Sequence, residues 1–256
     1  MNKSIKILYG ISIVMLIAFI GIVAYGYIQK LTVKEQKPIA TMEVEGFGTV
    51  KMELYPEIAP QAVSNFITLA NRGFYDGLTF HRIVKDFMIQ GGDKAGNGTG
   101  SAKISNLRDL KEGEEDKEYN IKGEFMINNV DNKLKMKEGV LAMARSNSYD
   151  SASSQFFIVT KDTPAIDGQY AGFGKVIEGM DIVHKIEEVE VKAKEGAGEN
   201  AEVSTPVNTI RITSIKVETN GVDYGMPNTI APQQAYDYSS LYEQMGIDPS
   251  QIVTTE

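Results

Sequence analysis

The feature that most constrains the fold of this chain is a series of short apolar runs, most of them bounded by Gly, Asp or Asn. Such runs occupy residues 78–84, 87–90, 139–144, 155–160 and 173–177. Runs of this length between turn residues are typical of β-strands, and only two segments carry the spacing of an amphipathic helix. Many short strands with two helices predict a small β-barrel whose ends are covered by the helices.

Apolar spacing also locates elements at both ends of this region. Residues 49–54 alternate between polar and apolar side chains, as in a half-buried strand, and residues 210–217 predict a last strand. A helix is expected to begin at Pro60, because the first helical turn does not need the missing N–H, and to end at Gly73. The second helix is expected over about residues 180–189.

A stretch of 22 residues without charge, residues 7–28, precedes the strands. As a helix it would be about 33 Å long, enough to cross the roughly 30 Å hydrocarbon core of a membrane. We therefore expect a transmembrane signal anchor at 7–28, with a short stub at 1–6 and a linker at 29–38. A cleaved signal peptide is the alternative, but the best cleavage sequence, at residues 24–26, is a poor one.

The expected location is the cell membrane, crossed once, with the folded domain on the outer side. A six-residue stub that stays inside while the body is translocated is the commoner arrangement. The chain has no Cys, which suits an oxidising exterior. Secretion after cleavage of the N-terminal segment is the alternative location.

Composition excludes several classes of function. Without Cys there is no disulfide framework, no thiol nucleophile and no Cys-based zinc site, and the two histidines, His81 and His184, are far apart in sequence. We therefore expect neither a metal nor a cofactor. The net charge of −8 argues against nucleic acid as a partner, because Lys and Arg carry most of the binding to phosphates.

Two segments interrupt the regular pattern. Residues 103–120 are highly charged and have little periodicity, so we expect an inserted surface loop. Residues 219–256 carry five acids, no basic residue and few large apolar side chains, which predicts a disordered acidic tail. The folded domain should therefore occupy residues 39–218.

Two polar motifs do not complete a catalytic pattern. The glycine-rich run at 96–100 is followed by no helix pattern and no Lys-Ser/Thr pair, so a phosphate-binding loop is not expected. The hydroxyl-rich run at 150–154 lacks the spacing and the histidine partner of a hydrolase nucleophile.

Arg82 lies in a predicted strand between large apolar residues. Phe87, Met88 and Gln90 follow closely, so this segment could form an apolar pocket that contains one cation and one amide. The residues taken alone favour a simpler interpretation, in which Arg82 lies at a solvated sheet edge while Phe87 and Met88 fill the core.

Four longer blocks of sequence surround these candidates. They are FYDGLTFHRIVKDFMIQGGD at 74–93, GVLAMARS at 139–146, SSQFFIVT at 153–160 and DGQYAGFGKVIEGMDIV at 167–183. The blocks resemble the cyclophilin-type peptidyl-prolyl cis-trans isomerases, in a bacterial form, and occur in the family's order within residues 39–218. The resemblance implies an all-β dominated fold, a closed eight-stranded antiparallel β-barrel capped by two α-helices.

The resemblance also implies an active groove on the outside of the barrel. Arg82 would be the catalytic cation and Gln90 a polar partner beside it. The substrate-binding residues would be Phe87, Met88, Phe157 and Ile166 around the proline ring, Gln155 as a second polar positioner, Ala144 and Arg145 along the peptide backbone, and Tyr170, where the family often has His.

Some positions depart from the family pattern. Arg145 stands where Asn is common, and it could either line the groove or point into solvent. Ala165 stands where Trp is common, which puts cyclosporin binding in doubt. His81 has no proton to transfer in a bond rotation, so we expect a structural role for it.

The resemblance implies an isomerase that rotates X–Pro peptide bonds of proline-containing polypeptides and so assists the folding of exported proteins. An alternative function is that of a non-catalytic, membrane-tethered chaperone that only holds proline segments. The presence of Arg82 favours catalysis, because holding a segment does not require a cation. A surface adhesin that uses the acidic tail rests on composition alone.

Overall fold

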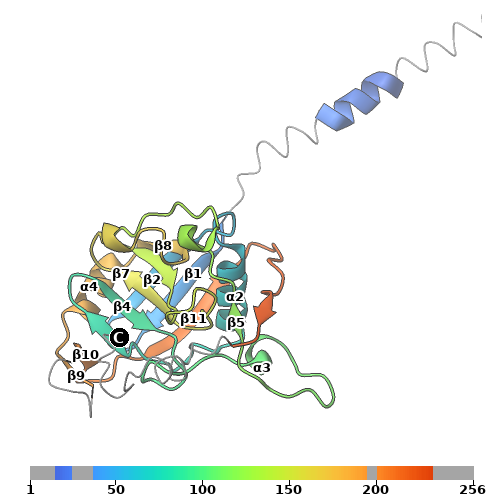
Figure 1. Cartoon of the computed structure of the whole chain (residues 1–256). Helices are drawn as coiled ribbons and strands as arrows, with labels where there is room; N and C mark the ends of the chain where they lie inside the picture. The colour runs from blue at the N-terminus through green and yellow to red at the C-terminus, as the bar shows by residue number, and fades with distance from the viewer. Residues whose placement is uncertain (1–14, 25–36, 195–200, 233–256) are drawn as a thin grey trace, which may run out of the picture. The chain divides into compact units, whose positions relative to one another are not determined.

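The computed structural model describes residues 15–24, 37–194 and 201–232. The chain divides into two units, Met1–Gln36 and Lys37–Glu256 (Figure 1).

In the first unit, residues 15–24 form a helix whose side chains are exposed. The rest of the expected membrane segment at 7–28 lies outside the described residues. Within the parts that are described, no helix combines the length and the apolar character needed to cross a membrane.

The second unit is built on one antiparallel sheet of eight strands, which curls strongly into a half-barrel (Figure 1). The strands follow the order β11-β1-β2-β8-β6-β7-β4-β3 across the sheet. Their bounds are β1 Ile39–Val44, β2 Gly48–Leu54, β3 Arg82–Val84, β4 Met88–Gly91, β6 Val140–Met143, β7 Phe156–Val159, β8 Gly172–Glu178 and β11 Ile212–Glu218.

The two edge strands of this sheet, β3 and β11, form no ladder with each other in the described structure, so the predicted closed barrel is wrong. One isolated bridge joins Thr79 to Arg211. Residues 77–80 also exchange backbone hydrogen bonds with Ile210 and Ile212. The regular part of β3 begins only after this segment, and the two edges therefore meet without forming paired strands.

The helix α2 (Pro60–Asn71) seals one side of the core, as predicted. Its Phe66 ring contacts the rings of Tyr75, Phe156 and Phe173 at centroid distances of 5.2, 5.5 and 5.3 Å. Aromatic pairs at such distances add about 0.5–1.5 kcal/mol beyond their burial. The helix and the curled sheet therefore share one aromatic core.

The first turn of α2 is capped by a distant side chain. The residue before the helix, Ala59, offers no side-chain cap. The N–H groups of Gln61 and Ala62 instead donate to the Glu124 carboxylate at 3.0 and 2.9 Å. This satisfies two helix-end donors that would otherwise lack partners. Burial raises the pKa of Glu124, and these two hydrogen bonds oppose that rise.

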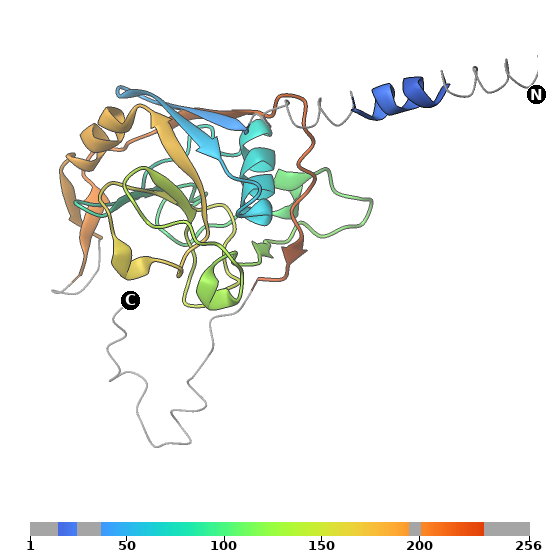
Figure 2. The same cartoon turned by 90° about the horizontal axis from the view of Figure 1, so that it is seen from above.

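The helix α4 (Met180–Glu187) packs on the same core as α2 but at the opposite side of the domain (Figures 1 and 2). It buries Val183 and Ile186, the face that the apolar spacing predicts. Gly179 precedes it with a φ of 86°, and a Cβ atom there would lie 2.5 Å from the carbonyl oxygen of Thr49. Only glycine fits at this turn, because both the conformation and the space exclude a side chain.

The remaining elements are short. They are α3 Ile104–Leu107, β5 Asn120–Ile121, β9 Val191–Ala193, β10 Val203–Pro206, β12 Thr229–Ile230 and the 3₁₀ turns Met126–Asn128 and Pro164–Ile166.

The charged segment 103–120 is only partly the surface loop that its composition predicts. Its centre, 108–118, is exposed or half-buried, but Leu107 and Tyr119 at its two ends are buried in the core. The Tyr119 hydroxyl donates to Asn65 Oδ1 of α2 at 2.6 Å. The prediction is wrong at these ends because isolated apolar residues in a charged sequence give no periodic signal.

The predicted disordered tail is wrong for its first part, residues 219–232. Here β12 pairs with β5, and the segment contacts α2 (Figure 2). The Ser64 hydroxyl donates to Gly225 O, and Asn228 N donates to Gln61 Oε1, both at 2.6 Å. Residues 233–256 lie outside the described residues.

Candidate active site

The strands β3, β4 and β7 place an apolar surface on the outside of the sheet. In β7, Phe156 and Ile158 enter the main core, while Phe157 and Val159 belong to a second, separate cluster. Directly opposite residues in antiparallel strands share a face. Gln90 therefore shares a face with Phe157, its partner in the register of β4 and β7.

The same register brings the predicted cation and amide together. Arg82 in β3 lies opposite Gln90 in β4.

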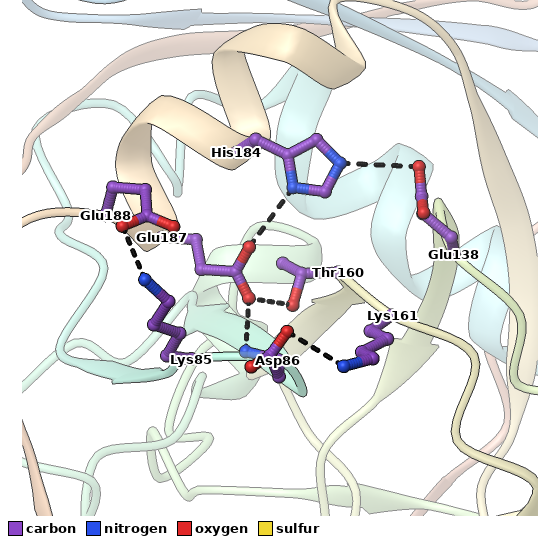
Figure 3. A network of polar contacts seen from close by, with 8 residues as sticks. All are labelled: Lys85, Asp86, Glu138, Thr160, Lys161, His184, Glu187 and Glu188. Carbon is purple, nitrogen blue, oxygen red and sulfur yellow. Dashed lines mark hydrogen bonds and ion pairs between the residues drawn. The ribbon is translucent and has the colours of Figure 1, made fainter.

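The turn between β3 and β4 is bound to α4. This turn contains Asp86 at a φ of 58°, and the Asp86 N–H donates to Glu187 Oε1 of α4 at 2.6 Å (Figure 3). Glu187 also accepts a hydrogen bond from the Thr160 hydroxyl. α4 thus holds the hairpin that carries Arg82, Phe87 and Met88.

A pocket with a volume of about 130 Å³ opens on this outer surface. The Phe157 and Tyr170 rings in its wall meet edge to face, with centroids 5.4 Å apart. Its walls are formed by Arg82, Phe87, Met88, Gln90, Ala144, Arg145, Phe157 and Tyr170.

A chain of amides connects Arg82 to a neighbouring loop. Arg82 Nη1 donates to Gln90 Oε1 at 3.1 Å, and Gln90 Nε2 donates to Gln155 Oε1 at 2.9 Å. Gln155 Nε2 in turn donates to the carbonyl oxygens of Gly98 and Gly100 at 3.1 and 3.0 Å. Both glutamines therefore have fixed orientations, and Gln90 presents its acceptor to the guanidinium.

Arg145 does not point freely into solvent. Its guanidinium carbon lies 4.7, 5.2 and 5.3 Å from the ring centroids of Tyr170, Phe125 and Tyr149. Its Nε donates to Gln169 O at 3.1 Å. Cation–π contacts of this kind hold the side chain against the pocket wall.

A second cavity, with a volume of about 330 Å³, adjoins the pocket and shares Gln90, Ala144 and Arg145 with it. Gln155 lines this second cavity rather than the first. The backbone N–H of Ala144 donates to Gln155 O at 2.9 Å, so this donor is already used within the protein. The Ala144 N–H therefore cannot donate a hydrogen bond to the backbone of a substrate peptide, although Ala144 was expected to lie along that backbone.

The structure brings together most of the predicted residues. Ile166 packs against the cluster that contains Met88 and Phe157 but does not line the pocket. The simpler interpretation of Arg82 is correct in one respect, since β3 is an edge strand of the sheet. Its guanidinium nevertheless forms part of the pocket wall.

His81 is buried beside this surface, and among the described residues neither of its ring nitrogens has a hydrogen-bond partner. Burial lowers the pKa of His81, so the neutral ring is favoured.

Ala165, which stands where the family often has Trp, is exposed. The described residues contain no cluster of three or more His, Asp or Glu side chains suited to a metal ion.

One contact of Arg82 was missed from the sequence. Its Nε and Nη2 donate to the two carboxylate oxygens of Glu202, each at 2.6 Å. Glu202 lies in a segment rich in Ala, Gly and Glu that has no apolar periodicity. Neither spacing nor resemblance could have placed it 120 residues away in sequence from its partner.

The sequence of this chain is similar to that of known proteins. Residues 39–217 match the family model described as "Cyclophilin type peptidyl-prolyl cis-trans isomerase/CLD". The "Peptidyl-prolyl cis-trans isomerase 9" of Schizosaccharomyces pombe is 36% identical over 66% of this chain, which spans only 24% of that relative. The "Peptidyl-prolyl cis-trans isomerase-like 1" of Neurospora crassa is 40% identical over 54% of this chain and 75% of its own length.

A solved structure is similar as well. The cyclophilin-type isomerase of Cryptosporidium parvum, crystallised in the presence of the dipeptide Ala-Pro, has a TM-score of 0.56 and 27% identity. The match covers 70% of this chain and 98% of that one. These comparisons give no support to the expected bacterial, membrane-anchored form. They do show that the chain belongs to the cyclophilin-type peptidyl-prolyl cis-trans isomerase family.

Proposed function

We propose that this protein catalyses the rotation of X–Pro peptide bonds at the outer pocket of β3, β4 and β7, with Arg82 as the catalytic residue. The observation that carries the proposal is the guanidinium of Arg82, held by Gln90 in the wall of a pocket that also presents the apolar side chains of Phe87, Met88 and Phe157. The dipeptide in the Cryptosporidium parvum study is the kind of ligand that such a pocket would hold.

The reaction needs electrostatic stabilisation rather than bond cleavage. Rotation about an amide C–N bond meets a barrier of about 18–20 kcal/mol because the bond has partial double-bond character. For X–Pro bonds the uncatalysed event takes about tens to hundreds of seconds. A gain of about four decades in rate corresponds to roughly 5–6 kcal/mol of transition-state stabilisation.

Arg82 can supply part of this stabilisation. In the twisted transition state the proline nitrogen becomes pyramidal and gains a lone pair, which can accept a hydrogen bond. The planar ground state lacks this acceptor, so a guanidinium N–H directed at the nitrogen lowers the barrier selectively. Arg suits the role because it stays protonated and can bind Gln90 and the substrate at the same time.

The apolar wall supplies orientation. Phe87, Met88 and Phe157 form a surface against which a proline ring can pack. Fixing the ring lets the acyl side of the bond turn relative to it, and it holds the nitrogen near Arg82. Tyr170 closes the pocket beside Phe157. Ile166 supports this wall from behind, and Gln155 fixes Gln90.

The test compares the purified full chain with its Arg82→Ala variant. Interconversion of the cis and trans forms of an Ala-Pro-containing peptide is measured by exchange NMR, and the fold is checked by circular dichroism. We expect the variant to remain folded and to lose about two decades or more of kcat. A folded variant with unchanged kcat would instead favour the non-catalytic holding function.

Cellular location and clients are further parts of the proposal. The uncharged stretch at 7–28 supports attachment to the cell membrane by a single pass, with the isomerase on the outer side and exported polypeptides as its clients. The reaction consumes no nucleotide, which suits a compartment without ATP. Protease treatment of intact cells should degrade the domain, and recovery of the protein in the soluble cell extract would contradict the proposal.

Cyclosporin is not expected to bind tightly, because Ala165 offers little apolar surface where the family often has Trp.

A further inference from the structure

The outer edge of the Arg82 guanidinium is bound by a carboxylate from a separate hairpin. Glu202 immediately precedes β10, which pairs with β9 and lies beside β3. Its Oε1 and Oε2 accept from Arg82 Nε and Nη2, both at 2.6 Å. This is the bidentate arrangement that gives an Arg–carboxylate pair both strength and a defined geometry.

The hydrogen bonds of Arg82 use some of its guanidinium donors and leave others for a substrate. A guanidinium has five N–H donors. Among the residues that the structure describes, two of these donors bind Glu202 and a third binds Gln90, which leaves two for a substrate. Glu202 is not among the residues that line the pocket, and the carboxylate therefore holds the cation without filling the space beside it.

From this geometry we propose that Glu202 is a positioning residue for the isomerase reaction. It fixes the rotamer of Arg82 so that the remaining N–H groups point into the pocket. The inference rests on the proposed role of Arg82. Without Glu202, a long side chain with about 2 kcal/mol of rotamer entropy would be held mainly by one hydrogen bond to Gln90.

The expected effect of Glu202 is on turnover rather than on binding. Displacing a catalytic group by about 1 Å can reduce the rate by as much as about 10²-fold. The apolar wall, which binds the proline ring in both the ground state and the transition state, is left intact by a change at Glu202. Loss of the carboxylate should therefore lower kcat and leave KM almost unchanged.

The test measures kcat and KM of the full chain by exchange NMR with the Ala-Pro-containing peptide. We expect Glu202→Gln to lower kcat about 10-fold with KM changed by less than about 2-fold. Glu190→Gln is the matched control, because Glu190 is an exposed acid at the base of the same hairpin and has no described contact with Arg82. The control should behave like the wild type.

Two further measurements separate positioning from a structural role. In the Arg82→Ala background, Glu202→Gln should have no additional effect on kcat, because its target is gone. The Nε–H signal of Arg82 in a ¹⁵N spectrum should be sharp in the wild type and should weaken or shift in Glu202→Gln. Equal losses of kcat in both backgrounds would overturn the proposal.

An increase of kcat in Glu202→Gln would also overturn it, since the carboxylate would then compete with the substrate for Arg82. Failure of this inference is distinct from failure of the proposed function. If the wild type is active, Arg82→Ala is inactive and Glu202→Gln is fully active, only the role of Glu202 is rejected. If Arg82→Ala keeps full activity, the proposed catalytic role itself is rejected.

Discussion

Phe157 and Arg82 line the same pocket, but the proposed mechanism gives them different roles in the reaction. The Phe157 ring offers apolar surface to a proline ring. The apolar surface of the proline ring does not change when the peptide bond twists. The contribution of Phe157 to binding is therefore similar in the ground state and in the transition state. In the proposed mechanism, Arg82 instead binds an acceptor that appears only during the twist.

We expect Phe157→Leu to raise KM about 5-fold, which corresponds to the loss of roughly 1 kcal/mol of apolar contact, with kcat changed by less than about 2-fold. Val159→Ala is the control, because Val159 belongs to the same buried cluster but does not line the pocket. Exchange NMR gives both constants. A loss confined to kcat would mean that the ring acts on the transition state instead.

At the scale of elements, α4 is tied to neighbouring segments by ionisable groups (Figure 3). His184 Nδ1 lies 3.1 Å from Glu187 Oε2, and its Nε2 lies 3.3 Å from Glu138 Oε1. The hydrogen bond with Glu187, followed by the contact with Glu138, raises the pKa of His184 above its ordinary value of 6.5. The same Glu187 holds the hairpin turn at Asp86.

This network predicts a pH-dependent contribution to stability. A raised pKa means that protonated His184 favours the folded state, so the contribution is complete below pH 6.5 and disappears as the pH rises through the folded-state pKa. Because the side chain is 41% exposed, the effect should be about 1 kcal/mol or less. Urea unfolding of the wild type and His184→Gln from pH 5.5 to 9 measures it, and a stability difference that does not change with pH would contradict the assignment.

The elements that the sequence predicts well are those with a sustained apolar period. Both helices, and the strands β2 and β6 to β8, were predicted close to their observed bounds because each buries apolar side chains, on one face in β2 and at every residue in β6 and β7. In the last strand, Ile212 and Ile215 are three residues apart, which breaks the alternation. The structure explains the break by a bulge, since Glu43 pairs with Ser214 and Val44 with Ile212.

The hairpin of β9 and β10 could not be predicted in this way. Its strands are three and four residues long and only Ser204 in them is buried, so they bury too little apolar surface to leave a pattern. The contact of Glu202 with Arg82 depends on this hairpin and was missed with it. Residues of the pocket were found because they lie in long blocks that resemble a known family.

At the scale of the whole molecule, the contacts between distant segments were the least predictable. Whether the sheet closes between β3 and β11 depends on how long each edge strand remains regular. The alternation of polar and apolar residues in the sequence does not show this length. The segment 219–232 has a composition typical of disorder, yet it adds β12 to β5 and contacts the outer face of α2. Hydrogen bonds to α2, the pairing with β5 and the packing of Tyr224 against the core hold it in place.

This segment provides the last prediction. A chain that ends at Glu218 should be less stable than a chain that ends at Pro232, because it loses the contacts at Ser64 and Gln61 and the pairing with β5. Each lost hydrogen bond is worth about 0.5–1.5 kcal/mol net, so we expect the shorter chain to be less stable by about 1–2 kcal/mol. Thermal unfolding should show a midpoint lower by about 2–8 °C. Equal midpoints would mean that ordering residues 219–232 costs as much free energy as their contacts return, and the segment would then contribute no stability to the isomerase domain.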